Sequence, residues 1–261
     1  MITVLPSLVV TSPEPPNTAD VGARTGADPE SDAGSHALSD AEGGRGVWCI
    51  VVAGGSGTRF GRPKQYEALG GSRVIDRSVA VADEVCDGVV VVVPAADVAT
   101  EALRFVHVVA GGASRSDSVR AGLACVPPDA TVVCVHDAAR PFATPQLYGR
   151  VTDAVLAGAD GAIPGLAVTD TIKVIGIDSV VIDTPGRDTL RAVQTPQAFR
   201  ADVLRRAHAA GSQGTDDATL VEHLGGRVVV VDGEIDNRKI TLPDDLDWAR
   251  AKVRQTTGAT R

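Results

Sequence analysis

The chain has 261 residues, a formal net charge of −8 and a pI near 5.1. Its 44% hydrophobic and 22% charged residues are typical of a globular protein and exclude a collagen-like or membrane-spanning chain. Because the total charge is acidic, the sequence shows no general attraction to nucleic acid or to an anionic membrane.

Residues 1–45 differ from the rest of the chain in composition. They hold seven acidic residues and two arginines, a net charge of −5, which leaves −3 for residues 46–261. The segment is rich in Pro, Gly, Ser and Asp and contains no aromatic residue, so it is predicted to be a disordered acidic extension. Its apolar start is short, contains Pro6 and has no Lys or Arg before it, so we expect no signal peptide.

From residue 47 onward, apolar strand patterns alternate with helical patterns. The expected strands are 47–53, 88–93, 105–109, 131–136, 161–164 and 227–231. The expected helices are 74–85, 116–125, 146–157, 201–210, 217–224 and 244–254. Continuous Val and Ile runs are typical of strands that are covered on both faces. The alternation predicts an α/β fold that is Rossmann-like, with a mainly parallel twisted sheet flanked by helices.

Residues 168–195 interrupt this alternation. Strand-like pieces at 171–175 and 180–182 surround a Gly/Asp turn, and no helical pattern accompanies them. The pattern predicts a β-arm that projects from the α/β body. An apolar hairpin without a covering helix needs a partner surface.

The four cysteines have no CxxC pairing, and the five histidines are scattered. Cys49 and Cys134 lie within expected strands. We therefore expect buried, reduced thiols in a cytoplasmic protein, without a zinc site.

The loop after the first expected strand has the sequence AGGSGTRFGRPKQ, residues 53–65. Glycines after a buried strand let backbone N–H groups approach a phosphate. The spacing matches neither the Walker A loop nor the GxGxxG dinucleotide fingerprint. Instead the loop carries two cations, Arg59 and Lys64, and predicts a polyphosphate site.

Three later loops extend this chemistry. They are GGASRSDS at 111–118, HDAARP at 136–141 and DNRKIT at 236–241. The first opens a helix with hydroxyl groups, and helix N-termini favour anions. A carboxylate at a strand end, as at Asp137, suits Mg²⁺. Because ligands bind at the carboxyl ends of parallel strands, these loops predict one shared site.

The chain resembles the family of 2-C-methyl-D-erythritol 4-phosphate cytidylyltransferases in seven segments. In chain order these segments are AGGSGTRF…PKQY, GG-x-x-R-x-DSV, VHDAARP, TDTIK, R-x₇-TPQ-x-F, TDDA and DN-x-K-x-T. The resemblance covers about residues 46–250 and implies a nucleotidyltransferase domain at 46–255. It implies that CMP passes from CTP to 2-C-methyl-D-erythritol 4-phosphate (MEP), giving CDP-methylerythritol and pyrophosphate in the non-mevalonate isoprenoid pathway, with Mg²⁺.

The resemblance also assigns roles to individual residues. Those implied to bind the nucleotide are Ala53, Gly54, Gly55, Gly57, Gly112 and Ser118. Those implied to hold the triphosphate and the transition state are Arg59, Lys64 and Lys239. Those implied to bind the sugar-alcohol phosphate are Asp137, Arg140, Thr171, Arg187, Thr195 and Thr215. Those implied as metal ligands are Asp137 and Asp236. Ala113 stands where some relatives have an acid, so a base contact there has to use the backbone.

Thr171 and Arg187 lie on the expected arm. In the resembling family the arm reaches across a dimer and binds the substrate phosphate of the other subunit. The resemblance therefore implies a homodimer in which each site is shared between two chains.

Three other readings stay open. Ribitol-5-phosphate cytidylyltransferases share the same loops, and sugar-1-phosphate nucleotidyltransferases share the first loop with its glycines, Arg and Lys. The segments TDTIK and R-x₇-TPQ favour the MEP enzyme over the sugar-1-phosphate enzymes. They favour it less decisively over the ribitol enzymes. A catalytically silent nucleotide-binding module is the alternative from another class. The presence of Arg59, Lys64 and Lys239 together argues against it.

Overall fold

The computed structural model describes residues 46–258, except residues 56, 58, 103, 106 and 212. The extension expected at residues 1–45 lies outside the described residues, so its disorder stays a prediction.

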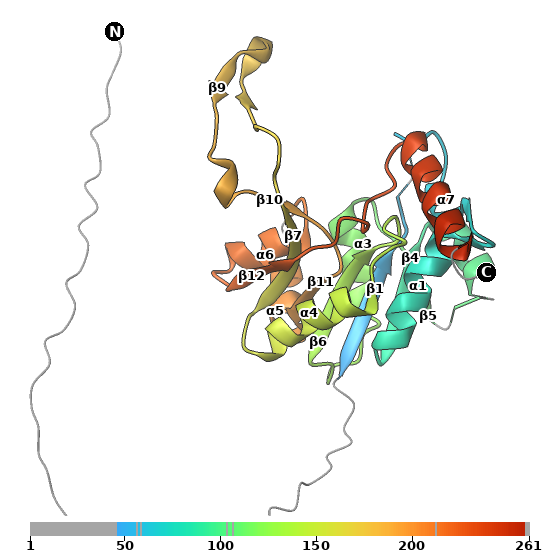
Figure 1. The fold of residues 1–261 in the computed structure, drawn as a ribbon. Helices are drawn as coiled ribbons and strands as arrows, with labels where there is room; N and C mark the ends of the chain where they lie inside the picture. The colour runs from blue at the N-terminus through green and yellow to red at the C-terminus, as the bar shows by residue number, and fades with distance from the viewer. Residues whose placement is uncertain are drawn as a thin grey trace, which may run out of the picture. The chain divides into compact units, whose positions relative to one another are not determined.

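A mainly parallel sheet forms the centre of the described chain (Figure 1). Its strands are β1 (Val47–Val52), β4 (Gly88–Val93), β5 (His107–Ala110), β6 (Val132–Asp137), β7 (Gly161–Ala167), β10 (Arg191–Val193), β11 (Gln197–Arg200) and β12 (Val228–Asp232). They lie in the order β10-β7-β11-β6-β1-β4-β5, and β12 also pairs with β7. Strands β10 and β11 run antiparallel to their neighbours, and the other pairs are parallel. The mainly parallel sheet is confirmed.

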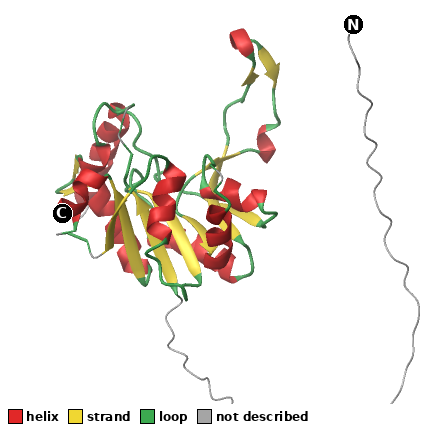
Figure 2. Cartoon of the chain, turned by 180° about the vertical axis from the view of Figure 1, so that it is seen from behind, coloured by secondary structure: helices red, strands yellow, loops and turns green. Residues whose placement is uncertain are grey.

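Helices cover both faces of this sheet, as Figure 2 shows from behind. The larger helices are α1 (Val74–Val85), α3 (Arg115–Leu123), α4 (Pro145–Leu156), α5 (Ala201–Ala209), α6 (Asp217–His223) and α7 (Pro243–Gly258), and a short α2 (Val98–Glu101) precedes β5. Alternate residues of β1 divide between two cores. Cys49 and Val51 pack with α1 and α4, whereas Ile50 packs with α3, α5 and α6. The sheet is therefore buried on both faces, as its Val and Ile runs predicted.

The starts of α3 and α4 show why these helices begin where they do. The Ser114 side chain accepts a hydrogen bond from the backbone N–H of Asp117, whose side chain accepts one from the Ser114 N–H. Thr144 caps α4 in a similar way, and Pro145 takes the first helical position. Each cap satisfies N–H groups that have no partner within the helix.

A third apolar cluster holds the loop after β1 in place. Phe60 in that loop is buried with Leu69 of β2 (Ala68–Leu69) and with Leu246 and Ala249 of α7. Strand β2 pairs with β3 (Ser72–Arg73). The third glycine of a dinucleotide fingerprint would stand at Phe60. A packed aromatic ring here fixes the loop against α7.

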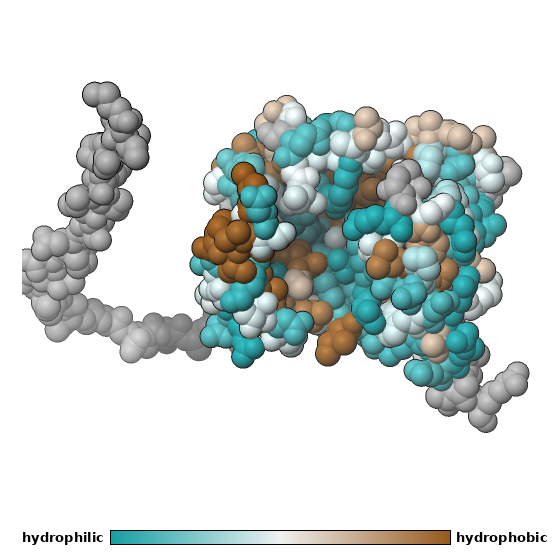
Figure 3. Space-filling model, turned by 90° about the horizontal axis from the view of Figure 1, so that it is seen from above, coloured by the Kyte–Doolittle hydropathy of each residue, from teal (hydrophilic) through white to brown (hydrophobic). Residues whose placement is uncertain are grey.

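The expected arm is present and projects from the body in Figures 1 and 2. Strands β8 (Val174–Ile175) and β9 (Val181–Asp183) pair antiparallel at its outer part. Its apolar side chains are exposed: Ile175 is 61%, Ile177 89% and Ile182 66% accessible. Seen from above, the arm contributes an apolar patch beside a hollowed polar surface (Figure 3).

The sequence patterns did not predict strand β11. The strand has the sequence QAFR, without a Val or Ile run; its four residues pair with β6, and Ala198 and Phe199 also pair with β7. Neighbouring strands rather than intrinsic preference determine its conformation.

All four cysteines lie among the described residues and are unpaired. Cys49 and Cys134 are buried as expected, whereas Cys125 is exposed at the turn that follows α3. No group of three or more potential metal ligands converges within the described residues. In the same part of the chain, no helix combines the length and the apolar character needed to cross a membrane.

Gly122 provides a test of how α3 packs on the sheet. A Cβ at this position would lie 2.6 Å from Ile50 Cγ2 and 3.0 Å from Val92 Cγ2. We expect Gly122→Ala to lower the free energy of unfolding by about 1–3 kcal/mol, because overpacking outweighs the better helix preference of Ala. Urea denaturation measures the change.

Gly149 in α4 is the matched control, since its added Cβ would meet nothing within 4 Å. Gly149→Ala should stabilise the protein by about 0.5–1 kcal/mol. Equal effects of the two substitutions would contradict the packing argument.

Candidate functional site

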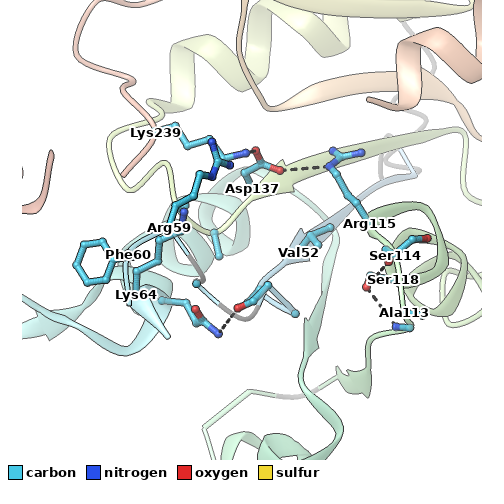
Figure 4. A pocket seen from close by; sticks show the side chains of 18 residues that line it. Val52, Arg59, Phe60, Lys64, Ala113, Ser114, Arg115, Ser118, Asp137 and Lys239 are labelled. Atoms are coloured by element: carbon cyan, nitrogen blue, oxygen red, sulfur yellow. Dashed lines mark hydrogen bonds and ion pairs between the residues drawn. The ribbon is translucent and has the colours of Figure 1, made fainter. Parts of the chain in front are cut away.

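A cavity of about 450 Å³ opens where β1 and β6 end. Residues from three loops line it, those that follow β1, β5 and β6, together with Lys239 from the segment after β12. Figure 4 shows the side chains of Arg59, Lys239 and Arg115 gathered about Asp137. The loops that the sequence predicted to meet at the carboxyl ends of the strands therefore line one cavity.

The loop after β1 needs glycine where it turns. Gly57 has φ +67°, and a Cβ there would lie 2.0 Å from the Arg62 carbonyl oxygen. The Gly57 carbonyl accepts hydrogen bonds from the N–H groups of Phe60 and Gly61 at 2.9 and 2.8 Å. The buried Gln65 side chain donates to the Gly55 carbonyl at 3.4 Å. Ala53, Gly54, Gly55 and Gly57 consequently line the cavity with backbone.

Three predicted cations face the same cavity: Arg59, Lys64 and Lys239. Lys64 begins the short helix η1 (Lys64–Tyr66) and is half-buried. Burial lowers the pKa of Lys64 below its ordinary value, and the positive charges of Lys239 and Arg59 lower it further. Crowded like charges favour the binding of an anion that neutralises them.

Asp137, the last residue of β6, lies between two cations. Its Oδ2 is 2.6 Å from Lys239 Nζ, and its Oδ1 is 3.5 Å from Arg115 Nε. Figure 4 shows Lys239 and Arg115 approaching the carboxylate from opposite sides. Burial acts to raise the pKa of Asp137, but Lys239 and Arg115 outweigh it and hold this pKa well below the usual value. The carboxylate is therefore charged although it is only 9% exposed.

A buried network fixes the backbone beneath Asp137. The Asp137 N–H donates to Thr195 Oγ1 at 3.0 Å, and Thr195 Oγ1 lies 3.1 Å from His136 Nδ1. His136 Nε2 is 3.2 Å from the Arg140 carbonyl, which can only accept. Nε2 therefore carries the proton, Nδ1 accepts from the Thr195 hydroxyl, and that oxygen accepts from Asp137.

Arg115 opens α3 and connects the cavity to a buried ion pair. Its NH1 is 2.6 Å from Asp217 Oδ2, and the other Asp217 oxygen lies 3.0 Å from His208 Nε2. Asp217 is fully buried. Arg115 lines the cavity but received no role from the sequence, although the GG-x-x-R motif contained it.

The turn before α3 has most of its polar groups paired internally. Ser118 Oγ accepts from the Gly112 N–H at 3.2 Å and donates to the Ser114 carbonyl at 3.0 Å. A Cβ on Gly112 would lie 2.3 Å from the Cβ of Asp117. Gly112, Ala113 and Ser118 line the cavity as predicted, and glycine is required for this close approach.

The guanidinium of Arg140 lies behind the cavity and not in its lining. Its NH1 donates to the Asn237 carbonyl at 2.8 Å, and its NH2 donates to the Val193 carbonyl at 3.3 Å. Gln194 accepts from the Glu234 N–H and donates to the Glu234 carbonyl, and Asn237 donates to the Thr195 carbonyl at 2.8 Å. Sequence reasoning missed Gln194 and Asn237, which stand inside the quoted motifs.

The remaining predicted residues do not line this cavity. Thr195 is buried beneath Asp137, and Thr215 is exposed just before α6. Asp236 is half-exposed and pairs with Lys252 Nζ at 2.6 Å. Thr171 and Arg187 are on the arm, where Arg187 donates to the Thr169 carbonyl at 2.9 Å.

Comparison with known proteins agrees with this geometry. The family model of 2-C-methyl-D-erythritol 4-phosphate cytidylyltransferase (IspD) matches residues 47–255. The chain belongs to this family.

Relatives with that name are matched over nearly their whole length. The enzyme of Rhodococcus jostii (strain RHA1) is 48% identical over 225 residues, which are 82% of this chain and 98% of the relative. The solved cytidylyltransferase of Thermus thermophilus is 32% identical with a TM-score of 0.68, covering 78% of this chain and 98% of its own. The 4-diphosphocytidyl-2C-methyl-D-erythritol synthase of Anaerococcus prevotii has 29% identity and a TM-score of 0.70, covering 80% and 98%.

In this cytidylyltransferase fold, the buried His136 makes stability depend on pH. Burial lowers the pKa of His136 from 6.5 to about 4. Between these values the unfolded chain binds a proton that the folded chain does not, so stability falls as pH falls. We expect this position to remove about 3 kcal/mol from the free energy of unfolding over that window.

Urea denaturation from about pH 7 to about pH 4.5 measures this slope. His136→Gln should flatten it, because glutamine does not titrate in this range. A His136→Gln slope equal to that of the wild type would contradict the assignment.

Proposed function

We propose that this chain transfers CMP from CTP to MEP, giving CDP-methylerythritol and pyrophosphate in the non-mevalonate isoprenoid pathway. The observation that carries the proposal is the convergence of Arg59, Lys64 and Lys239 on a glycine-lined cavity, with the charged Asp137 beside Lys239. Membership of the IspD family supports the choice of CTP and MEP.

The reaction needs positioning and charge neutralisation more than acid or base chemistry. A phosphate oxygen of MEP attacks the α-phosphorus of CTP in line, the new P–O bond forms, and the bond to pyrophosphate breaks. A phosphate monoester has a second pKa of about 6, so the nucleophile is already ionised at neutral pH. In this proposal the three cations stabilise the charge that gathers on the phosphoryl oxygens.

The backbone of the loop after β1 would cradle the triphosphate, with Ala53, Gly54, Gly55 and Gly57 offering approach without side-chain interference. At the turn before α3, the N–H of Gly112 is already paired with Ser118. Contacts to cytosine and ribose would therefore use the Gly112 carbonyl and the backbone of Ala113, with Ser118 holding the turn.

Mg²⁺ is part of the proposal, and the donor chemistry of the cavity fits it. Mg²⁺ is usually held by one or two carboxylates together with substrate phosphates, and Asp137 is the carboxylate among the described lining residues. Asp236 pairs with Lys252 away from this lining, so the proposed metal site does not include it. When bound, Mg²⁺ would neutralise phosphate charge beside the three cations.

The exposed apolar arm supports a homodimer. Its apolar side chains are uncovered, and Thr171 and Arg187 lie outside the cavity of their own chain. We propose that the arm docks on a second copy and delivers these two residues to the MEP phosphate there. The unpaired cysteines support the cytoplasmic location expected from the sequence.

Pyrophosphate release from CTP with each acceptor tests the function. MEP with Mg²⁺ should give turnover, and ribitol 5-phosphate should give at least about tenfold less, because the motifs favour MEP. Release with ribitol 5-phosphate alone would overturn the substrate assignment. Release with neither acceptor would favour the silent nucleotide-binding module.

Lys64→Ala and Lys239→Ala test the cation assignment. Each should lower kcat by about 10²–10³, the order expected when one preorganised donor to the transition state is lost. Lys252→Ala is the matched control, since Lys252 lies on α7 and pairs with Asp236 outside the cavity lining. Its kcat should stay within about twofold of wild type. A wild-type kcat in either cavity variant would contradict that residue's role.

Subunit mixing tests the shared site. Lys64→Ala and Arg187→Ala chains should each be nearly inactive alone, because each lacks one half of every site. Mixed dimers should recover activity, since one of their two sites combines intact Lys64 with intact Arg187. Two tags and tandem purification isolate the mixed dimers. Dimers without recovered activity would show that Arg187 does not act across subunits.

A further inference from the structure

We propose that Arg115 is a positioning residue for the cytidylyl transfer: anchored on the buried Asp217, it holds Asp137 in place while Lys239 turns to the phosphates. The inference rests on the proposed function and assigns to Arg115 and Asp217 roles that the sequence motifs did not give them.

The first step is the difference between the two cations that hold Asp137. Lys239 is 39% exposed in its side chain, whereas the Arg115 side chain is 25% exposed. Lys239 has a flexible stem and pairs with Asp137 through its single ammonium group. Arg115 is engaged a second time, with its NH1 2.6 Å from Asp217. Of the two, Lys239 is free to follow an arriving phosphate, and Arg115 is tethered.

The second step concerns the anchor. A fully buried carboxylate is costly unless it is paired and hydrogen-bonded. Asp217 meets this requirement with Arg115 on one oxygen and His208 Nε2, 3.0 Å away, on the other. Because Asp217 and His208 are both buried, on α6 and α5, the tether of Arg115 is attached to the body of the fold.

The third step is the geometry of the guanidinium. Arg115 uses NH1 toward Asp217 and Nε toward Asp137, so one planar group spans two carboxylates. A lysine ammonium is a single point charge and cannot reproduce this fork. With Thr195 fixing the backbone N–H of Asp137 from below, Arg115 fixes its carboxylate from the side. The carboxylate then faces the cavity whatever the position of Lys239.

Arg115→Lys separates positioning from support of the fold. The lysine keeps a positive charge beside Asp217, so we expect thermal stability close to wild type. Turnover should nevertheless fall, with kcat lowered by about 10–10² and KM for CTP changed less than about threefold, because small misplacements in a reacting site cost rate. A purely structural role predicts that kcat recovers together with stability, and that result would overturn the proposal.

Asp217→Asn tests whether Asp217 acts through Arg115. It should lower kcat in the wild-type background and add little in the Arg115→Met background, where the tether is already gone. The double variant also removes the unpaired buried charge that could unfold Arg115→Met alone. Independent, multiplying losses would overturn the link between the two residues.

Arg205→Met is the matched control. Arg205 is also a half-buried arginine that ties two elements, from α5 to the carbonyl of Pro127 at 2.7 Å, and it does not line the cavity. Its substitution should lower stability without lowering kcat more than about twofold. An equal loss of kcat in Arg205→Met and Arg115→Met would point to general loosening of the fold and overturn the proposal.

A crystal structure with CTP and Mg²⁺ provides a readout apart from turnover. We expect the Arg115 contact with Asp217 to remain and Lys239 Nζ to leave Asp137 for a phosphate oxygen. An Arg115 side chain that releases Asp217 and binds phosphate would overturn the positioning role. Failure of the proposed function would show differently, as a wild-type chain without turnover on MEP.

Discussion

Asp137 is buried at the end of β6, and each of its two carboxylate oxygens forms an ion pair with a cationic side chain. Burial favours its neutral form, and the positive charges of Lys239 and Arg115, with a smaller contribution from Arg140, keep the carboxylate ionised by lowering its pKa. Those two cations come from the segment after β12 and from the start of α3. The requirement to keep one charge inside the cavity therefore brings distant parts of the chain to a single point.

Most of the structure behind the cavity serves this arrangement through backbone contacts. The side chains of Gln194, Asn237 and Arg140 tie the segment before β11 to the segment that carries Lys239. Their partners are mainly carbonyl and N–H groups, so the bonds fix the path of the chain. Buried polar networks of this kind are specific because each unmade bond is costly.

The sequence predicted the parts of the molecule that follow periodic or local rules. Val and Ile runs identified β1, β4 and β6, and the glycines and cations of the loop after β1 identified the cavity. It could not predict β11, whose conformation comes from the strands on either side. The sequence also could not distinguish the residues that line the cavity from those that hold the backbone behind it. Arg140 and Thr195 belong to the expected motifs but bind backbone groups behind the cavity, whereas Arg115 lines it.

Strand β11 also has a consequence for how the chain can assemble. Within the described residues it alone joins the β6 side of the sheet to the β7 side, and it is antiparallel to both. The ribosome synthesises β6 and β7 before β11. The β6 side and the β7 side of the sheet can therefore join only after the four residues of β11 have been made and have paired between them. Such non-local pairing slows folding, and until it forms the open edges of β6 and β7 are exposed to other chains.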